Sequence, residues 1–403
     1  MSHLTPARHL CAALLTLGLL ASCSGVIGEA SGDGGISPQG EDDGGSGGDA
    51  GSGDAGSGDA GSTPVFVAQG HAGRTTVSCD DGNTWVANRS DNDSIVCFTN
   101  GVDCDHQSGA GRGITFGQGY FVATFGWGAP GTVRRSRNGV QWETMLSSNE
   151  SFAGVVFGAD TFMLGGRPPR LSTDRGASWQ AGGEVHSEQW NVRRSGFAAH
   201  GGGRLVLAFG SEGNDVNISS DRGVTWTRPA TLPAACAGDM QWSGGIEYGN
   251  GVMLIVGGTG VACRSTDGGQ TWTETSVGGA VSAQLLWTGT EFLTWGRTGN
   301  GTPALFRSTN GAAWTATPTV VRRRASGGAT SERPGPDVGA VARSDTGTFV
   351  AVRGGWQVWY DQQEFYRSTD GIIWDALPPG AFVGSHPIQF IAFGRTAPGV
   401  SCP

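Results

Sequence analysis

The sequence contains no lysine, because all 26 basic residues among its 403 positions are arginines. This absence excludes a lysine Schiff base, a lysine general base and the lysine-containing loop that binds nucleotide phosphates. The sequence also has no Cys-x-x-Cys pair and no two histidines at the spacing of metal ligands. It therefore predicts no metal site and no cofactor.

Long apolar runs are scarce as well, and the clearest one lies near the N-terminus. Leu10 to Leu20 follows Arg8, has the length of the apolar part of a signal peptide, and is too short to span a bilayer. The next stretch, Leu20-Ala21-Ser22-Cys23, resembles the lipobox of bacterial lipoproteins. The resemblance implies that residues 1–22 are a signal peptide, that Cys23 is lipidated, and, with Ser24 rather than aspartate, that the anchor is in the outer membrane. The alternative is an ordinary secretory signal, and in both cases the mature chain is exported.

Apolar residues are almost absent from the segment that follows. Residues 23–63 consist mainly of Gly, Ser, Asp and Ala, so we expect a disordered linker between the lipidated cysteine and the folded part. This linker holds eight of the 35 acidic residues and no arginine. Subtracting these eight, and Arg8 of the signal, leaves 27 acidic and 25 basic residues in residues 64–403. A nearly neutral folded domain argues against nucleic acid as a partner.

The sequence is rich in glycine, with 72 residues, and in a short motif that recurs seven times. The motif reads Ser-x-Asp-x-Gly-x-x-Trp, with a variant one residue shorter that has Asn or Asp after Ser-x. Successive copies start 36 to 60 residues apart, a spacing typical of propellers and solenoids. No long window shows helical periodicity, so the glycines fit short strands joined by tight turns. The copies begin at Ser78, Ser136, Ser172, Ser219, Ser265, Ser308 and Ser368.

Each copy suits a tight turn between two strands. The Asp or Asn side chain can accept backbone hydrogen bonds, Gly can adopt a positive φ, and the Trp can begin the next strand with its N–H bonded. The motif resembles the Asp-box, or BNR, repeat, in which the turn joins the third and fourth strands of a propeller blade. The resemblance implies a structural role, rather than metal binding or catalysis, for Asp80, Asn138, Asp174, Asp221, Asp267, Asn310 and Asp370.

The stretches between the turns complete a repeating unit of strand, turn, strand, longer loop and strand. With the motif turn and the strand after it, this unit is a four-stranded antiparallel blade. Pro64 to Ala68, before the first motif, matches a second strand, and Pro387 to Gly394, after the last motif, matches a first strand. We therefore expect an all-β domain, a seven-bladed propeller over residues 64–403. The C-terminal strand should complete the N-terminal blade and leave no open edge.

Six cysteines fall in the expected propeller, and export favours disulfides. Six cysteines allow fifteen connectivities, so the pairing stays open. Cys97 and Cys104 are close in sequence and can close one loop, and Cys236 and Cys263 flank the first two strands of one blade. The remaining two, Cys79 and Cys402, lie in the two halves of the shared blade, where a bond would lock the ring.

Function has to be inferred from a site rather than from the repeat. Sialidases with the same motif use a tyrosine–glutamate pair, three arginines and an Arg-Ile-Pro motif on six blades, and this sequence has no such motif. Xyloglucanase-like glycosidases place two aspartates between two propellers, and only one propeller fits here. The architecture is most similar to the seven-bladed assembly factors of photosystem II, which bind partners. We therefore expect a monomeric, surface-tethered binding or scaffold propeller and no catalytic residues. The alternative is a sialidase-like glycoside hydrolase or a polysaccharide lyase.

The candidate ligand-binding residues lie away from the motif turns. The loops between second and third strands, and the crossovers between blades, should emerge at the opposite face because strand direction alternates. Guanidinium groups there suit carboxylates, and aromatic rings suit a sugar face or a protein hot spot. The alternative is that the arginines pair with loop carboxylates such as Asp337. The candidates, for a protein or glycan-like ligand, are Arg112, Trp127, Arg167, Trp190, Arg193, Arg194, Trp242, Arg297, Arg333, Trp356, Tyr360 and His386.

Overall fold

The fold is known from a computed structural model that describes fifteen segments of the chain. They are residues 62–70, 75–87, 110–126, 131–148, 152, 154–166, 168–185, 196–201, 203–209, 215–237, 245–325, 327–353, 364–378, 388–396 and 399–402. All belong to one compact unit, Gly48–Pro403, and the predicted signal peptide, Cys23 and most of the predicted linker lie outside them. None of the helices in these segments is both long and apolar enough to cross a membrane.

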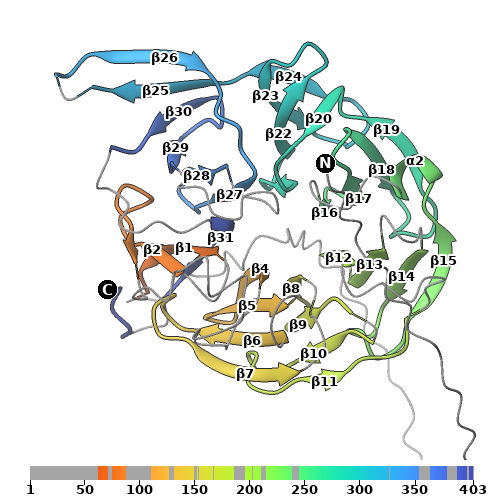
Figure 1. Cartoon of the computed structure of the whole chain (residues 1–403). Helices are drawn as coiled ribbons and strands as arrows, with labels where there is room; N and C mark the ends of the chain where they lie inside the picture. Colours follow the sequence, from red (N-terminus) through yellow and green to blue (C-terminus); the bar gives the residue numbers. More distant parts are fainter. Residues whose placement is uncertain are drawn as a thin grey trace, which may run out of the picture. The chain divides into compact units, whose positions relative to one another are not determined.

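The described strands form seven sheets, and each sheet contains four antiparallel strands of the predicted unit (Figure 1). In the first sheet the order is β31 (Ile388–Arg395), β1 (Pro64–Gly70), β2 (Thr75–Ser78), β3 (Val86–Ala87). In the second it is β4 (Ala110–Gly117), β5 (Tyr120–Gly126), β6 (Gly131–Ser136), β7 (Glu143–Ser148). In the third it is β8 (Val155–Gly158), β9 (Thr161–Leu164), β10 (Arg170–Ser172), β11 (Gln180–Ala181).

The remaining four sheets continue the series along the chain. The fourth has β12 (Gly196–Gly201), β13 (Arg204–Phe209), β14 (Asp215–Ser219), β15 (Thr227–Thr231), and the short helix α2 (Ala234–Ala237) follows it. The fifth has β16 (Gly245–Gly249), β17 (Val252–Val256), β18 (Val261–Ser265), β19 (Thr273–Ser276). In the sixth, both β20 (Gly279–Val281) and β21 (Leu286–Trp287) pair with β22 (Phe292–Thr298), and the sheet continues with β23 (Pro303–Ser308), β24 (Thr315–Pro318).

The seventh sheet departs from the predicted unit because it has six strands. Its four regular strands are β27 (Ala340–Arg343), β28 (Phe349–Val352), β29 (Tyr366–Ser368), β30 (Ile373–Ala376). The crossover before them folds into two extra strands, β25 (Val320–Arg324) and β26 (Thr330–Pro334). β25 pairs in parallel with β30, and β26 forms the edge. The architecture is an all-β, seven-bladed propeller, as the sequence predicts.

The first strands of the sheets lie side by side. β31 contacts β27 on one side and β4 on the other, and the series continues through β8 and β12 to β16, which contacts β21. Hydrogen bonds from Ser282 to the Val338 oxygen and from Gln284 to the Val341 oxygen join the sixth sheet to the seventh. The core lies between neighbouring sheets, as where Leu254 of β17 packs with Phe306 of β23. The first strands therefore form the inner layer of the propeller.

The predicted closure of the ring is confirmed. β31 pairs antiparallel with β1 along its length, from Pro64 opposite Arg395 to Gly70 opposite Ile388. A disulfide joins Cys79 to Cys402 across 323 positions of sequence. A second disulfide joins Cys236 to Cys263, as proposed from their positions. The third candidate pair, Cys97 and Cys104, lies outside the described residues.

Glycines at the ends of the first strands receive aromatic rings from the next sheet. A Cβ atom on Gly249 of β16 would overlap the ring of Trp287, and one on Gly117 of β4 would overlap the ring of Phe157. The same relation holds between Gly394 of β31 and the ring of Phe116. This contact explains why the sequence repeats an aromatic residue followed by glycine, since the ring of one sheet fills the space left by the glycine of the sheet before it.

Candidate functional site

The seven repeat turns, the motif copies named above, each join the third and fourth strands of a sheet. In the copy at Ser265, the serine Oγ donates to Asp267 Oδ1 at 2.6 Å and accepts from the Gly269 N–H at 2.8 Å. Asp267 also accepts from the backbone N–H of Thr271 at 2.9 Å and from its hydroxyl at 2.6 Å. Trp272 Nε1 donates to the Gly269 oxygen at 3.0 Å. The serine hydroxyl, the aspartate carboxylate and the tryptophan N–H are thus all bonded within the turn.

The carboxylates of the turns are held ionised. In the fourth sheet, hydrogen bonds from Ser219 and Thr225 lower the pKa of Asp221 to about 2. In the shorter turn of the second sheet, Asn138 Oδ1 takes the place of the carboxylate and accepts from the backbone N–H groups of Val140 and Gln141, each at 3.0 Å. An amide can serve in the same position, so the position needs a hydrogen-bond acceptor rather than an acid or base.

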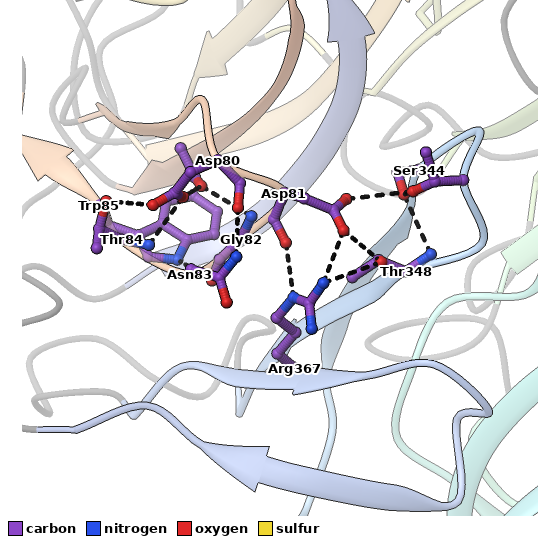
Figure 2. A network of polar contacts seen from close by, with 11 residues as sticks. Asp80, Asp81, Gly82, Asn83, Thr84, Trp85, Ser344, Thr348 and Arg367 are labelled. Atoms are coloured by element: carbon purple, nitrogen blue, oxygen red, sulfur yellow. Dashed lines mark hydrogen bonds and ion pairs between the residues drawn. The ribbon is translucent and has the colours of Figure 1, made fainter.

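The repeat turns also bind the preceding sheet, and Figure 2 shows this at the junction of the last sheet with the first. Arg367 in β29 donates to the backbone oxygen of Asp81 at 2.8 Å and to its Oδ2 at 2.7 Å. Thr348 Oγ1 donates to the same carboxylate oxygen at 2.5 Å. Although burial opposes the shift, these bonds hold the pKa of Asp81 below its ordinary value. The charged groups on this face therefore join sheets together.

The face away from the repeat turns, here called the opposite face, carries the loops between second and third strands and the crossovers. Nine of the twelve candidate ligand-binding residues lie outside the described residues. They are Trp127, Arg167, Trp190, Arg193, Arg194, Trp242, Trp356, Tyr360 and His386. The structure places the other three, Arg112, Arg297 and Arg333, on three different sheets.

Two of these three arginines lie near the ends of strands on the opposite face. Arg112 occupies an irregularity in the pairing of inner strand β4 with β5, between Gly111 and Gly113. Arg297 in β22 donates to both oxygens of Asp337, at 2.7 and 2.9 Å, and to the Gly301 oxygen at 2.7 Å. Arg297 therefore fixes the crossover that leads to the last sheet.

The third, Arg333, is not where the sequence suggested. It lies on β26, and β26 follows β25 and β30 at the outer edge of the seventh sheet. The expectation that Arg333 converges on the channel mouth with the other crossover residues is therefore wrong. The reason is that this crossover forms its own hairpin, which continues the sheet outward from β30 and does not fold over the inner strands (Figure 1).

Arg333 instead belongs to a group that we call the hairpin cluster: Arg323, Arg333, Glu364 and Tyr366. Arg323 donates to both carboxylate oxygens of Glu364, and Arg333 Nη2 lies 3.9 Å from Glu364 Oε2. The Tyr366 hydroxyl donates to Glu364 Oε2 at 2.7 Å. Glu364 precedes β29, so the cluster lies at the end of the sheet away from its repeat turn.

The electrostatics of the hairpin cluster favour binding over nucleophilic chemistry. Hydrogen bonds from Arg323 hold the pKa of Glu364 below its ordinary value. Burial, and then the bond to Glu364, raise the pKa of Tyr366 well above its ordinary value. The phenol therefore stays protonated at neutral pH and is not an activated nucleophile. The side chain of Arg333 is 59% exposed and can offer a guanidinium fork to an external carboxylate.

Sequence reasoning missed two features of the structure. One is the hairpin, although the run Arg322-Arg323-Arg324 followed by Gly327-Gly328 contained a signal for a charged strand and a turn. The other is Glu247 on inner strand β16, whose pKa burial raises to about 8 and whose Oε1 accepts from the Tyr248 N–H at 3.2 Å. Within the described segments, no three His, Cys, Asp or Glu side chains are grouped so that they could hold a metal ion.

Comparisons with known proteins show the fold alone. No protein-family model and no curated protein matches the chain. A solved protein from Lactobacillus plantarum is 10% identical, with a TM-score of 0.55 over 83% of this chain and 99% of its own. A putative 6-phosphogluconolactonase from Bacteroides uniformis is 7% identical, with a TM-score of 0.52 over 82% and 99%. YCF48 from Cyanidioschyzon merolae is 18% identical, with a TM-score of 0.44 over 68% and 87%.

Proposed function

We propose that this protein is an exported, surface-tethered binding propeller that recognises a protein partner or an anionic, glycan-like ligand on the opposite face. The observation that carries the proposal is the hairpin cluster, where an exposed guanidinium stands beside an ionised carboxylate and a phenol held protonated. Such a group can bind carboxylates but has no activated nucleophile. The charged groups of the repeat turns, by contrast, are engaged within the fold.

The proposal includes the type of repeat and the anchor. The bonding of serine, aspartate and tryptophan in the repeat turns supports a turn of the Asp-box type. The stretch Leu20-Ala21-Ser22-Cys23 supports a lipid on Cys23, which would hold the protein at the outer membrane.

The anchor is tested by replacing Cys23. We expect the intact protein to partition into detergent, and Cys23→Ser to shift it to the aqueous phase, because acyl chains hold a protein at a membrane and a cleaved signal does not. The measurement is phase partitioning of both forms expressed with the full signal. Equal partitioning would show that there is no lipid anchor.

Binding is tested with two anionic probes, fluorescein-labelled polygalacturonate and poly-glutamate. Wild-type protein should bind at least one of them, and replacing Arg333 of the hairpin cluster by alanine should weaken that binding by about tenfold or more. The control carries Val224→Ser and Gln270→Ala on exposed parts of repeat turns and should bind like the wild type. Equal affinity of all three forms would contradict the proposal. Release of new sugar ends from polygalacturonate would favour the hydrolase or lyase alternative.

A further inference from the structure

The outer strand of the hairpin, β26, is exposed along its whole length. Two hydrogen bonds fix the direction of its backbone groups. Ala325 N–H donates to the Ala329 oxygen at 2.8 Å, and Gly335 N–H donates to the Thr319 oxygen at 3.1 Å. Hydrogen-bonded pairs alternate in an antiparallel ladder, so residues 331 and 333 bond inward to β25. The backbone groups of residues 330, 332 and 334 consequently face away from the sheet.

The backbone groups of β25, the other strand of the hairpin, alternate in the same way. Val320, opposite Pro334, turns its N–H away from β26 and donates to the Ile372 oxygen at 3.0 Å. The outward groups of β26 are therefore the N–H and C=O of Thr330, the N–H and C=O of Glu332, and the C=O of Pro334. Two donors and three acceptors in a row are the pattern that an added antiparallel strand can use.

The charge of the hairpin favours an acidic segment as that strand. The hairpin carries four arginines at positions 322, 323, 324 and 333, against the carboxylates of Glu332 and Glu364 beside it. Arg322 donates to Glu332 at 2.9 Å, but the side chain of Arg322 remains 40% exposed. A carboxylate on the incoming strand opposite Arg333 can form an exposed cross-strand pair with it.

Charge also argues against a second copy of this chain as the occupant. If two β26 strands paired antiparallel through their outward groups, with Thr330 of one strand opposite Pro334 of the other, the two copies of Glu332 would lie directly opposite each other. Like charges in that position are destabilising. An acidic strand from a partner is attracted to the arginines of the hairpin, whereas self-pairing brings four more arginines to the same edge.

We propose that β26 binds an extended acidic segment of a partner protein as a seventh strand of its sheet. The proposal deepens the proposed function, on which it rests, by naming the partner class and the mode of binding. Backbone hydrogen bonds to Thr330 and Glu332 supply part of the affinity, and the arginines select acidic side chains.

The test compares two variants at one position. Glu332→Ala removes the ion pair with Arg322 but keeps the outward N–H, whereas Glu332→Pro also removes that N–H. The probe is a fluorescein-labelled peptide of alternating glutamate and valine, followed by fluorescence anisotropy. The wild type and Glu332→Ala should bind it with similar affinity, and Glu332→Pro should bind about tenfold more weakly. A peptide of alternating lysine and valine should not bind.

A second measurement covers the case in which Glu332→Pro disturbs the hairpin. The same acidic peptide with its alternate amides N-methylated, in each of the two registers, keeps its charge and loses backbone donors, and at least one should bind wild-type protein about tenfold more weakly. Unchanged affinity of both methylated peptides, equal binding by the alanine and proline variants, or a β26-dependent dimer in light scattering would overturn strand addition. Retained, arginine-dependent binding of polygalacturonate in those cases would leave the proposed function standing.

Discussion

At the scale of the residue, the acceptor position of the repeat turns can hold either Asp or Asn, and the two differ in their sensitivity to acid. Asp267 and Asn138 accept the same kind of backbone hydrogen bond, but only the aspartate can be protonated. Hydrogen bonds lower the pKa of Asp174, Asp221 and Asp267 to about 2, against the opposing effect of burial in Asp174 and Asp267. The turns that carry an aspartate should therefore be the acid-labile ones.

The expected result is a loss of stability in acid. A carboxyl with a folded-state pKa of about 2 and an ordinary value of 3.8 stabilises the fold above 3.8, and this contribution disappears as the pH falls towards 2. The thermal midpoint should therefore drop between pH 4 and 2, and Asp267→Asn should reduce the drop. If Asp267→Asn leaves the pH profile unchanged, the carboxylate is not what the turn depends on.

Glu247 should show the reverse dependence. Burial raises its pKa from the ordinary value of 4.5 to about 8, so the folded state loses stability as the pH rises from 4.5 through 8. Glu247→Gln should increase the denaturant midpoint at pH 8 and change it little at pH 4. Glu274→Gln, on an exposed position of the same sheet, is the control. An equal gain at both pH values would show that packing, and not ionisation, is responsible.

The sequence predicts the hydrogen bonds within each repeat turn but not the contacts of the turn with the neighbouring sheet. Hydrogen bonding within the turn is local, so the role of Asp267 and the bonded N–H of Trp272 could be predicted. Burial of the tryptophans could not, because it depends on the neighbouring sheet: Trp374 is fully buried and Trp272 is only partly buried. The roles of the candidate arginines could not be predicted either. Arg297 binds Asp337, and this contact joins residues 40 positions apart in sequence.

At the scale of the element, the aromatic–glycine contacts position each inner strand against the next. Gly249→Ala should destabilise the protein by about 1 to 3 kcal/mol, because its Cβ would overlap the ring of Trp287 in a packed interface. Gly299→Ala is a suitable control, since a Cβ there would meet nothing within 4 Å. Denaturant midpoints of the two variants measure the difference. A cost at Gly299 equal to that at Gly249 would point to backbone entropy instead of the ring contact.

The element that the sequence did not predict is the hairpin. The four-strand unit could be recognised because strand, turn and tryptophan recur in every blade. β25 and β26 occur once, and β25 pairs in parallel with β30, some fifty residues further along the chain. Because β25 and β30 are parallel and far apart in sequence, no tight turn connects them and the sequence carries no turn signal for their pairing. A crossover that adds strands to the sheet therefore cannot be told from an ordinary crossover by its sequence.

At the scale of the whole molecule, closure depends on the first sheet, where β31 pairs with β1 and a disulfide joins Cys79 to Cys402. Chain-entropy arguments predict that replacing both cysteines of this bond by alanine costs about 2 kcal/mol more than doing so for Cys236 and Cys263, because the closed loops span 323 and 27 positions. Denaturant titration of the two double variants tests this. A larger loss for the shorter loop would show that local packing dominates.

The pairing of β1 with β31 also sets an order of events during synthesis and folding. β1 is synthesised more than 300 residues before its partner Ile388–Arg395, so the inner edge of β1 keeps unpaired backbone groups until the last strand is available. During that interval the nascent chain offers an open edge to any other extended segment. A chaperone bound to this edge would protect it, and the completed propeller would not need one.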